Sequence, residues 1–142
     1  MAEARRSAAT VAVGDELTAI TVELDRARLV RYAGAALDFN PIHWSEQAAA
    51  AAGLPDVIAH GMLTMAVAGR LITDWAGDPG AVEEFTTRFS GMVPVGAERP
   101  AEVVIGGTVV ELNGDRATVD LTVEVSGAPV LKAARAVVHL AP

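Results

Sequence analysis

The sequence predicts an α+β fold in which an antiparallel sheet wraps around one enclosed helix. Two observations predict it. Near Val82 the spacing of apolar residues changes from the helical period of about 3.6 to the strand period of about 2. Residues 61–75 are apolar around most of the helical circumference, which indicates an enclosed helix. A sheet and a helix of this kind are expected to bury their apolar faces against each other.

The chain length and composition indicate one soluble domain. With 142 residues the chain has the size of a single domain, and we expect a loose N-terminus at 1–10 and one domain at 11–142. A net charge of −7 argues against binding to nucleic acid or to an anionic membrane. The chain has no cysteine, no secretory signal pattern and no run of 18 apolar residues. The sequence therefore predicts a cytoplasmic protein that does not enter a membrane.

Local signals divide the first half of the chain into one strand and three helices. Residues 18–24 have high strand propensity, and Asp25 is a helix N-cap that starts a helix running to Ala36. Ser45 can cap a second, short helix that passes through an alanine run and stops at Gly53. The third helix, at 61–75, is the apolar one.

The second half reads as an antiparallel meander. Strands are expected at about 84–92, 103–112, 116–126 and 130–140. The strand at 116–126 alternates strictly between apolar and polar residues, so it should have one dry and one wet face. Asn113 and Gly114 predict a two-residue hairpin before it.

Residues 38–43, which read Asp-Phe-Asn-Pro-Ile-His, are the clearest candidate for chemistry. Pro41 lacks an amide hydrogen and pushes Asn40 into an extended conformation, so this stretch cannot be a continuous helix. Asp38 and His43 can then turn toward one point, where one group takes a proton while the other gives one. From their spacing alone, a capping carboxylate and a surface imidazole are the commoner interpretation.

Two neighbouring polar residues have simpler interpretations. Asn40 can build the turn through its side chain. His60 is either a third proton-transfer group or, as we favour, a hydrogen-bonded histidine at the start of a helix. A metal triad of Asp38, His43 and His60 matches no ligand spacing typical of metal sites, so no metal is expected.

Several segments in order resemble a known family. Residues 32–34 (Tyr-Ala-Gly), 38–43 and 58–62 (Ile-Ala-His-Gly-Met) resemble the signature of the MaoC-like (R)-specific enoyl hydratases, the hydratase-2 family. Residues 74–82 and 88–89 resemble the catalytic B-type subunit of actinobacterial (3R)-hydroxyacyl-ACP dehydratases. The resemblance covers nearly the whole chain from about Val13.

The resemblance implies a single hot-dog fold, in which a curved antiparallel sheet wraps around a long central helix. It also implies a hydro-lyase activity without a cofactor. The implied reaction is reversible syn addition of water to a trans-2-enoyl thioester, which gives the (3R)-hydroxyacyl thioester in fatty-acid or polyketide-type metabolism. It implies that Asp38 and His43 are the catalytic pair and that the Gly61 amide donates to the thioester carbonyl. A helix N-terminus suits that task because its first amides lack partners. The residues expected to shape the site are Leu37, Asn40, Pro41, His60 and Met62.

One departure from the family concerns Leu37. The family usually has a small hydroxyl residue and then glycine before the catalytic aspartate, where this chain has Ala36 and Leu37. Leucine adds bulk beside the reacting carbons and removes the freedom of glycine to adopt a positive φ. We therefore expect an altered pocket or an altered substrate choice, with the acid–base pair intact.

Partners and alternative functions stay open at the level of the sequence. The substrate is expected to be an acyl-CoA or acyl-ACP thioester, and a dimer is expected, either a homodimer or a heterodimer with a second hot-dog chain. An acidic carrier protein would need a local basic patch, for which Arg26, Arg28, Arg31 and Arg70 are candidates. The alternatives are a partner-dependent acyl-binding subunit and a thioesterase on the same fold.

Overall fold

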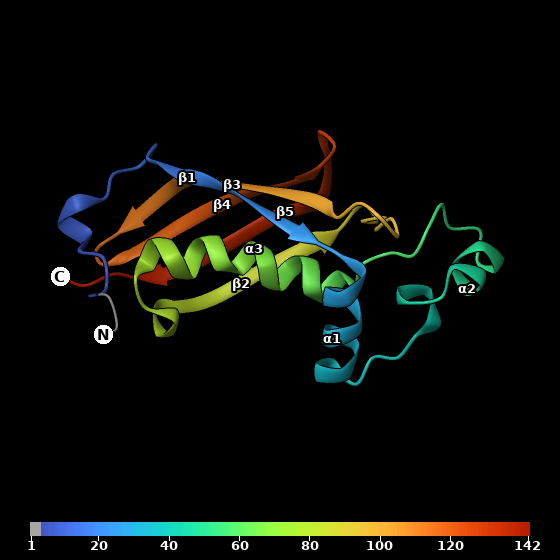
Figure 1. The fold of residues 1–142 in the computed structure, drawn as a ribbon. Coiled ribbons are helices and arrows are strands. Elements are labelled where there is room, and N and C mark those ends of the chain that lie inside the picture. Colours follow the sequence, from blue (N-terminus) through green and yellow to red (C-terminus); the bar gives the residue numbers. More distant parts are fainter. Residues whose placement is uncertain (1–3) are drawn as a thin grey trace.

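The computed structural model describes residues 4–142 and shows a sheet that curves over one long helix (Figure 1). The elements in chain order are η1 (Ala8–Thr10), β1 (Glu16–Leu24), α1 (Arg26–Ala36), η2 (Pro41–His43), α2 (Glu46–Ala51), α3 (Gly61–Ala76), η3 (Pro79–Ala81), β2 (Val82–Phe89), β3 (Ala101–Asn113), β4 (Arg116–Val125) and β5 (Ala128–His139). This arrangement confirms the predicted α+β, hot-dog fold.

The five strands form one antiparallel sheet in the order β1-β3-β4-β5-β2. Strands β3, β4 and β5 form the expected meander, but β2 is not its first member. It crosses to the far edge and pairs with β5, for example Phe85 with Ala136. The strand spacing could not show this, because the partner of β2 is set by packing across the sheet.

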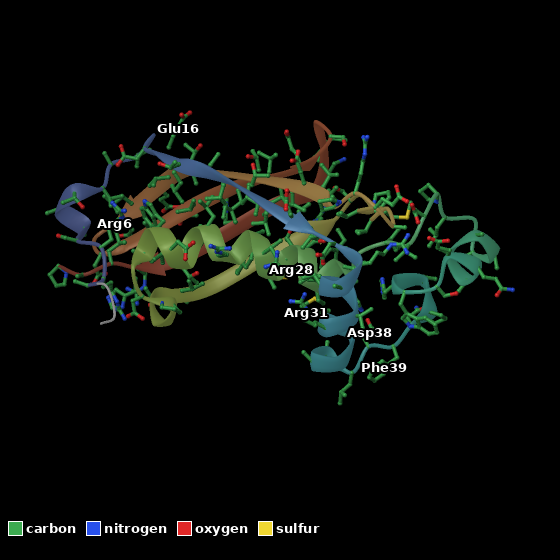
Figure 2. All side chains as sticks on the ribbon, in the orientation of Figure 1. Arg6, Glu16, Arg28, Arg31, Asp38 and Phe39 are labelled. Carbon is green, nitrogen blue, oxygen red and sulfur yellow. The ribbon has the colours of Figure 1, made fainter. Side chains whose placement is uncertain are left out.

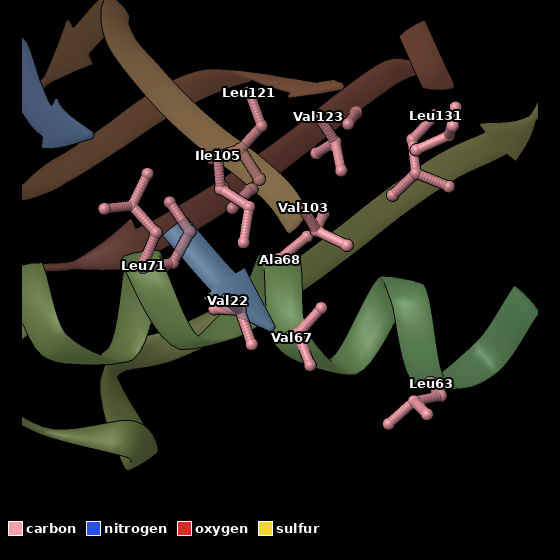
Figure 3. Close-up of a cluster of buried hydrophobic side chains, with 14 of the residues drawn as sticks. Val22, Leu63, Val67, Ala68, Leu71, Val103, Ile105, Leu121, Val123 and Leu131 are labelled. Carbon is pink, nitrogen blue, oxygen red and sulfur yellow. The ribbon is translucent and has the colours of Figure 1, made fainter. Parts of the chain in front are cut away.

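Helix α3 lies across the concave face of the sheet and fills its core (Figures 1 and 3). Leu63, Val67, Ala68 and Leu71 of α3 are buried in the same apolar cluster as inward-facing residues of the strands. In Figure 3 these partners include Val103, Ile105, Leu121, Val123 and Leu131. A side chain of this size contributes roughly 1.5–3 kcal/mol when it is fully buried, so this interface holds the helix in place.

The structure corrects one expectation about α3, which is not enclosed on all sides. Met62, Ala66 and Arg70 are exposed, and their spacing places them on one face of the helix. The apolar residues of the sequence therefore include some that face away from the core of this chain.

Most of the predicted caps and turns are present. The Asp25 side chain accepts a hydrogen bond from the Arg28 amide, and the Ser45 hydroxyl accepts one from the Ala48 amide. The β3–β4 hairpin is shifted by one residue from its expected position, because Asn113 pairs with Arg116 and the turn is formed by Gly114 and Asp115. Gly114 has a φ of +61°, which suits a tight hairpin turn.

Residues 4–10, within the stretch expected to be loose, are attached to the body of the protein. Main-chain hydrogen bonds join Arg6 to Ala76 and Ala8 to Ala141, and the Arg5 guanidinium pairs with Asp78 at 2.6 Å. Residues 1–3 of that stretch lie outside the described residues. None of the helices within residues 4–142 is long and apolar enough to span a membrane.

Candidate active site

The candidate site begins where α1 ends, at Leu37 and Asp38. Leu37 is the C-cap of α1 and lies in the left-handed region, with φ 57° and ψ 29°. The expectation that leucine would exclude a positive φ here is wrong. The left-handed turn ends the helix and sends the chain on to Asp38 (Figure 2), in a conformation that costs a residue with a Cβ atom about 1–2 kcal/mol. The Leu37 side chain itself is 77% exposed.

Asparagine and proline then form the tight turn that brings Asp38 and His43 together. Asp38 Oδ1 accepts a hydrogen bond from the Asn40 amide at 3.2 Å, and Asn40 Oδ1 accepts one from the Ile42 amide at 3.3 Å. Asn40 thus caps η2, and Pro41 occupies its first position, where no amide hydrogen is needed. This is the turn-building role expected for Asn40.

His43 is buried and its ring orientation is fixed by the main chain. Its Nδ1 lies 2.7 Å from the carbonyl oxygen of Ile58. Because a carbonyl oxygen can only accept, Nδ1 carries the proton, and in the neutral ring Nε2 keeps its lone pair. The segment that provides this carbonyl is itself fixed, since Ala59 and Val95 donate main-chain hydrogen bonds to Val93 and Val57. His43 is therefore held as a base with one defined free nitrogen.

His60 stacks on His43 and also contacts the main chain of Asp38. The two ring centroids are 3.8 Å apart with 22° between the ring planes. His60 Nε2 donates to the Asp38 carbonyl oxygen at 3.2 Å, and Tyr32 packs edge-on against the ring with centroids 4.8 Å apart. Both catalytic candidates thus contact one buried imidazole. His60 was expected to shape the site, but its stacking on His43 could not be predicted, because an irregular segment separates the two residues.

The environment of His60 favours its neutral form. The ring is 2% exposed, and Nδ1 has no hydrogen-bond partner within residues 4–142. Burial lowers the pKa of His60 from its ordinary value of 6.5, and the neighbouring His43 lowers it further, while the hydrogen bond to the Asp38 main chain partly opposes this. His60 is thus an uncharged contact for His43.

The same three residues also have the proximity of a metal site, but not its geometry. One ligand-capable atom from each of Asp38, His43 and His60 lies within 4.8 Å of the other two. A metal ion lies close to the plane of each imidazole that binds it, at about 2.0–2.1 Å. Two rings stacked face to face with nearly parallel planes cannot both meet that condition for one ion. The arrangement therefore suits proton transfer better than metal binding.

Helix α3 places its free amides beside this cluster. His60 is its N-cap, and the amides of Gly61 and Met62 have no hydrogen-bond partner within the described residues. A Cβ atom on Gly61 would lie 3.2 Å from the ring of Phe89. Glycine therefore lets the Phe89 ring pack close to the start of α3 without crowding. The N-terminal amides of a helix attract negative charge. The cluster thus combines a carboxylate, a base and unpaired donors.

Large apolar side chains surround the cluster but are exposed. Leu37, Phe39, Trp44 and Met62 are each more than half exposed, and Figure 2 shows Phe39 directly after Asp38 past the end of α1. Such a group of exposed apolar residues is typical of a binding surface.

Comparison with known proteins identifies the relatives of this chain. The sequence model of the family described as "MaoC like domain" matches residues 8–128. A solved structure named "MaoC-like dehydratase" is 41% identical and superposes with a TM-score of 0.94 over 98% of this chain and 43% of its own. The (R)-hydratase from A. caviae involved in PHA biosynthesis is 26% identical, with a TM-score of 0.83 over 94% of this chain and 99% of its own.

The curated relatives are much longer than this chain. The fatty acid synthase beta subunit pkiC of Emericella nidulans is 41% identical over 64 residues, which are 44% of this chain and 3% of that protein. The chain therefore spans only a small part of these fungal subunits.

Proposed function

Because the chain belongs to the MaoC-like domain family, we propose that it is an (R)-specific hydro-lyase acting on acyl thioesters. It adds water to trans-2-enoyl thioesters and removes it from (3R)-hydroxyacyl thioesters, in fatty-acid or polyketide-type metabolism. The single observation that carries this proposal is the contact of Asp38 and His43 with the same buried imidazole, next to the unpaired amides at the start of α3.

In the hydration direction, Asp38 and His43 hold one water molecule between them. Nε2 of His43 takes a proton from this water because Nδ1 is committed to the Ile58 carbonyl. The water oxygen bonds to C3 of the substrate, and the electron pair of the double bond moves toward the thioester oxygen. C2 then receives a proton from the protonated His43 ring, which returns to its neutral form, so the elements of one water molecule are added to the double bond. Dehydration reverses each step. Positioned acid–base groups of this kind typically contribute a factor of about 10²–10⁴ in rate.

The Gly61 amide stabilises the negative charge that develops on the thioester oxygen. The dipole of α3 adds to this effect, because its positive end lies at Gly61. Removing one such donor from an oxyanion site costs about 3–4 kcal/mol of transition-state stabilisation. His60 positions the two catalytic residues relative to each other. Leu37 and Met62 line the approach to them.

A hydration assay with crotonyl-CoA tests the proposal. The purified protein should remove the enoyl absorbance, and chiral analysis should identify the (3R) product. Release of free CoA thiol with no loss of the double bond would instead identify a thioesterase. Repeating the assay over a series of acyl lengths, as CoA and as carrier-protein thioesters, defines the substrate.

A dependence on a partner chain is the second candidate, favoured by the exposed apolar residues around the site. We propose that a second hot-dog chain, identical or different, covers Phe39, Trp44 and Met62 and completes the acyl pocket. In the heterodimer case, the chain would be the counterpart of the catalytic B-type subunit of the actinobacterial dehydratases. Sedimentation analysis alongside the assay separates the cases: an active homodimer needs no other chain, whereas an inactive protein that a second hot-dog chain activates is one half of a heterodimer.

A further inference from the structure

A groove of about 820 Å³ lies between β1, α1, α3 and the loop at 96–100, and four arginines line it. They are Arg28, Arg31, Arg70 and Arg99, which we call the arginine groove. The whole chain has only eleven lysines and arginines and a net charge of −7. More than a third of its positive charges therefore face one groove.

Most N–H donors of the guanidinium groups in the arginine groove have no hydrogen-bond partner within the described residues. Within residues 4–142, Arg31 and Arg99 form no side-chain hydrogen bond or ion pair. Arg70 pairs only with Asp74, at 3.4 Å and with both side chains more than half exposed, and such a surface pair is weak. Arg28 gives one donor to the main-chain oxygen of Glu23. These groups can turn toward an incoming anion.

Arg26 shows what a structural arginine looks like in the same helix. It donates to the Val95 carbonyl at 2.5 Å and to Asp56 at 2.7 Å, and it also contacts Glu46 at 3.3 Å. The sequence offered four arginines as a basic patch. Of these, Arg26 is occupied by contacts within the protein and does not line the groove, whereas Arg99 lines it together with the other three.

The arginine groove remains positive when its acidic residues are counted. Glu23, Asp25 and Glu98 also line it, so four positive and three negative charges leave a net +1. The Asp25 carboxylate is occupied in capping α1, where it accepts a hydrogen bond from the Arg28 amide at 2.7 Å. In a protein of net charge −7, a positive groove is a selective place for an anion.

The groove is connected to the candidate active site along two helices. Arg70 lies nine residues after Gly61 in α3, which is about 14 Å at the helical rise per residue. Met62, Ala66 and Arg70 form an exposed line on that helix, which runs from the candidate site to the groove. Figure 2 shows Arg28 and Arg31 beside α1 and α3, with Asp38 just past the end of α1.

We propose that the arginine groove binds the phosphate at the far end of the pantetheine arm of the thioester substrate. This inference rests on the proposed function, because both CoA and carrier-protein thioesters carry that arm and that phosphate. The arm has about the length of four extended residues, roughly 14 Å, which matches the distance from Gly61 to Arg70. Arginine is suited to phosphate because its fork of donors binds two oxygens at once.

The test compares substrates with and without the phosphate. In an Arg31→Gln/Arg70→Gln double variant, kcat/KM for crotonyl-CoA should fall about tenfold or more relative to kcat/KM for the crotonyl thioester of N-acetylcysteamine, which has no phosphate. The loss should appear in KM. Raising the salt concentration should increase the wild-type KM for crotonyl-CoA more than that of the variant.

An Arg135→Gln variant is the matched control, because it removes an exposed charge that pairs with Asp120 on the sheet, away from the groove. It should leave the ratio of the two substrates unchanged. A crotonyl carrier-protein substrate assayed in parallel identifies the source of the phosphate: whichever carrier shows the rise in KM is the one that uses the groove. An unchanged ratio for both carriers, or an equal loss with N-acetylcysteamine, overturns the proposal.

Direct binding separates this proposal from the proposed function. Calorimetric titration with CoA alone needs no turnover and should show binding to the wild type that the double variant weakens about tenfold. Equal affinities would overturn the arginine groove even in an active enzyme. An inactive wild type that still loses CoA affinity in the variant would overturn the reaction and keep the groove.

Discussion

The sheet and the segment that joins α1 to α3 differ in the polarity of the side chains that they bury. In β3 and β4 the inward residues, such as Ile105 and Val119, are fully buried and apolar. In the joining segment Phe39 and Trp44 are more than half exposed, and the buried side chains include two imidazoles, His43 and His60, besides apolar ones such as Val57. Within the described residues, the side chains buried in the sheet are thus all apolar, whereas the joining segment also buries two imidazoles.

This difference separates the source of stability from the source of chemistry. Burying an imidazole costs free energy unless its nitrogens are paired. His43 and His60 each pair one nitrogen with a main-chain carbonyl, and Nδ1 of His60 has no partner within the described part of the chain. The sheet and α3 supply the stability that lets this segment hold such groups.

The largest effect should come from the sheet, with Ile105→Ala. Ile105 is fully buried and lies in register with Ile20 and Val123 on the neighbouring strands. Truncation should lower the free energy of unfolding by about 2–5 kcal/mol, because it leaves a cavity in the core. Val104→Ala, on the outer face of the same strand, should cost less than about 1 kcal/mol. Urea unfolding measures both, and equal losses would contradict the division between the two regions.

The next effect should come from Gly61→Ala, at the boundary of the two regions. The new Cβ would lie 3.2 Å from Phe89 and beside the amide proposed to hold the thioester oxygen. We expect kcat/KM for crotonyl-CoA to fall about tenfold or more. Gly69→Ala is the control, because its Cβ would similarly meet Phe85 at 3.3 Å, two turns further along α3. Hydration kinetics that change equally in both variants would contradict a special role for Gly61.

A smaller effect concerns the response to acid of the joining segment. Burial lowers the pKa of His60 in the folded protein, whereas the unfolded chain binds that proton near pH 6.5. As the pH falls through 6.5 the unfolded state therefore binds more protons, and the free energy of unfolding decreases. His60→Phe keeps an aromatic ring against His43 and removes this contribution.

Urea unfolding at a series of pH values between 5 and 8 checks this response. The difference in unfolding free energy between the wild type and His60→Phe should shift in favour of the variant as the pH falls. His139→Gln is the control, because it removes a histidine that lies outside the joining segment. His139 is partly exposed and contacts Asp115 at 2.8 Å. A pH-independent difference for His60→Phe would mean that His60 is not the group that titrates.

The smallest effect should come from Leu37→Gly, at the left-handed end of α1. Glycine adopts a φ of 57° without the Cβ conflict, so the variant should gain up to about 1 kcal/mol in unfolding free energy. Leu37→Ala removes the same side chain and keeps the conflict, so it should change stability little. Thermal unfolding compares the two, and an equal response would show that the left-handed turn carries no strain.

Features set by neighbouring residues could be predicted from the sequence. The caps at Asp25 and Ser45 and the alternating burial of β4 follow from local rules and are present. The hairpin at Asn113 was displaced by one residue, because its register depends on the pairing of β3 and β4 as well as on the turn. The sequence indicated the turn at Asn40 for the same local reason.

Features set by contacts between distant residues could not be predicted. The place of β2 beside β5 and the exposed face of α3 depend on how whole elements pack. The stacking of His60 on His43 joins residues seventeen positions apart through the fold. Leu37 departs from the local preference of residues with a Cβ atom for a negative φ. The end of α1 and the turn at Asn40 together require a left-handed residue there.

Activity and stability measured together in Asp38→Asn and His43→Ala test the proposed acid–base pair most directly. Each change should reduce hydration of crotonyl-CoA by a factor of about 10² or more. For Asp38→Asn, whose side chain is exposed, the free energy of unfolding should stay within about 1 kcal/mol of the wild type. A wild type whose hydration activity survives both changes, or an Asp38→Asn variant that loses activity only because it unfolds, would contradict the proposed pair.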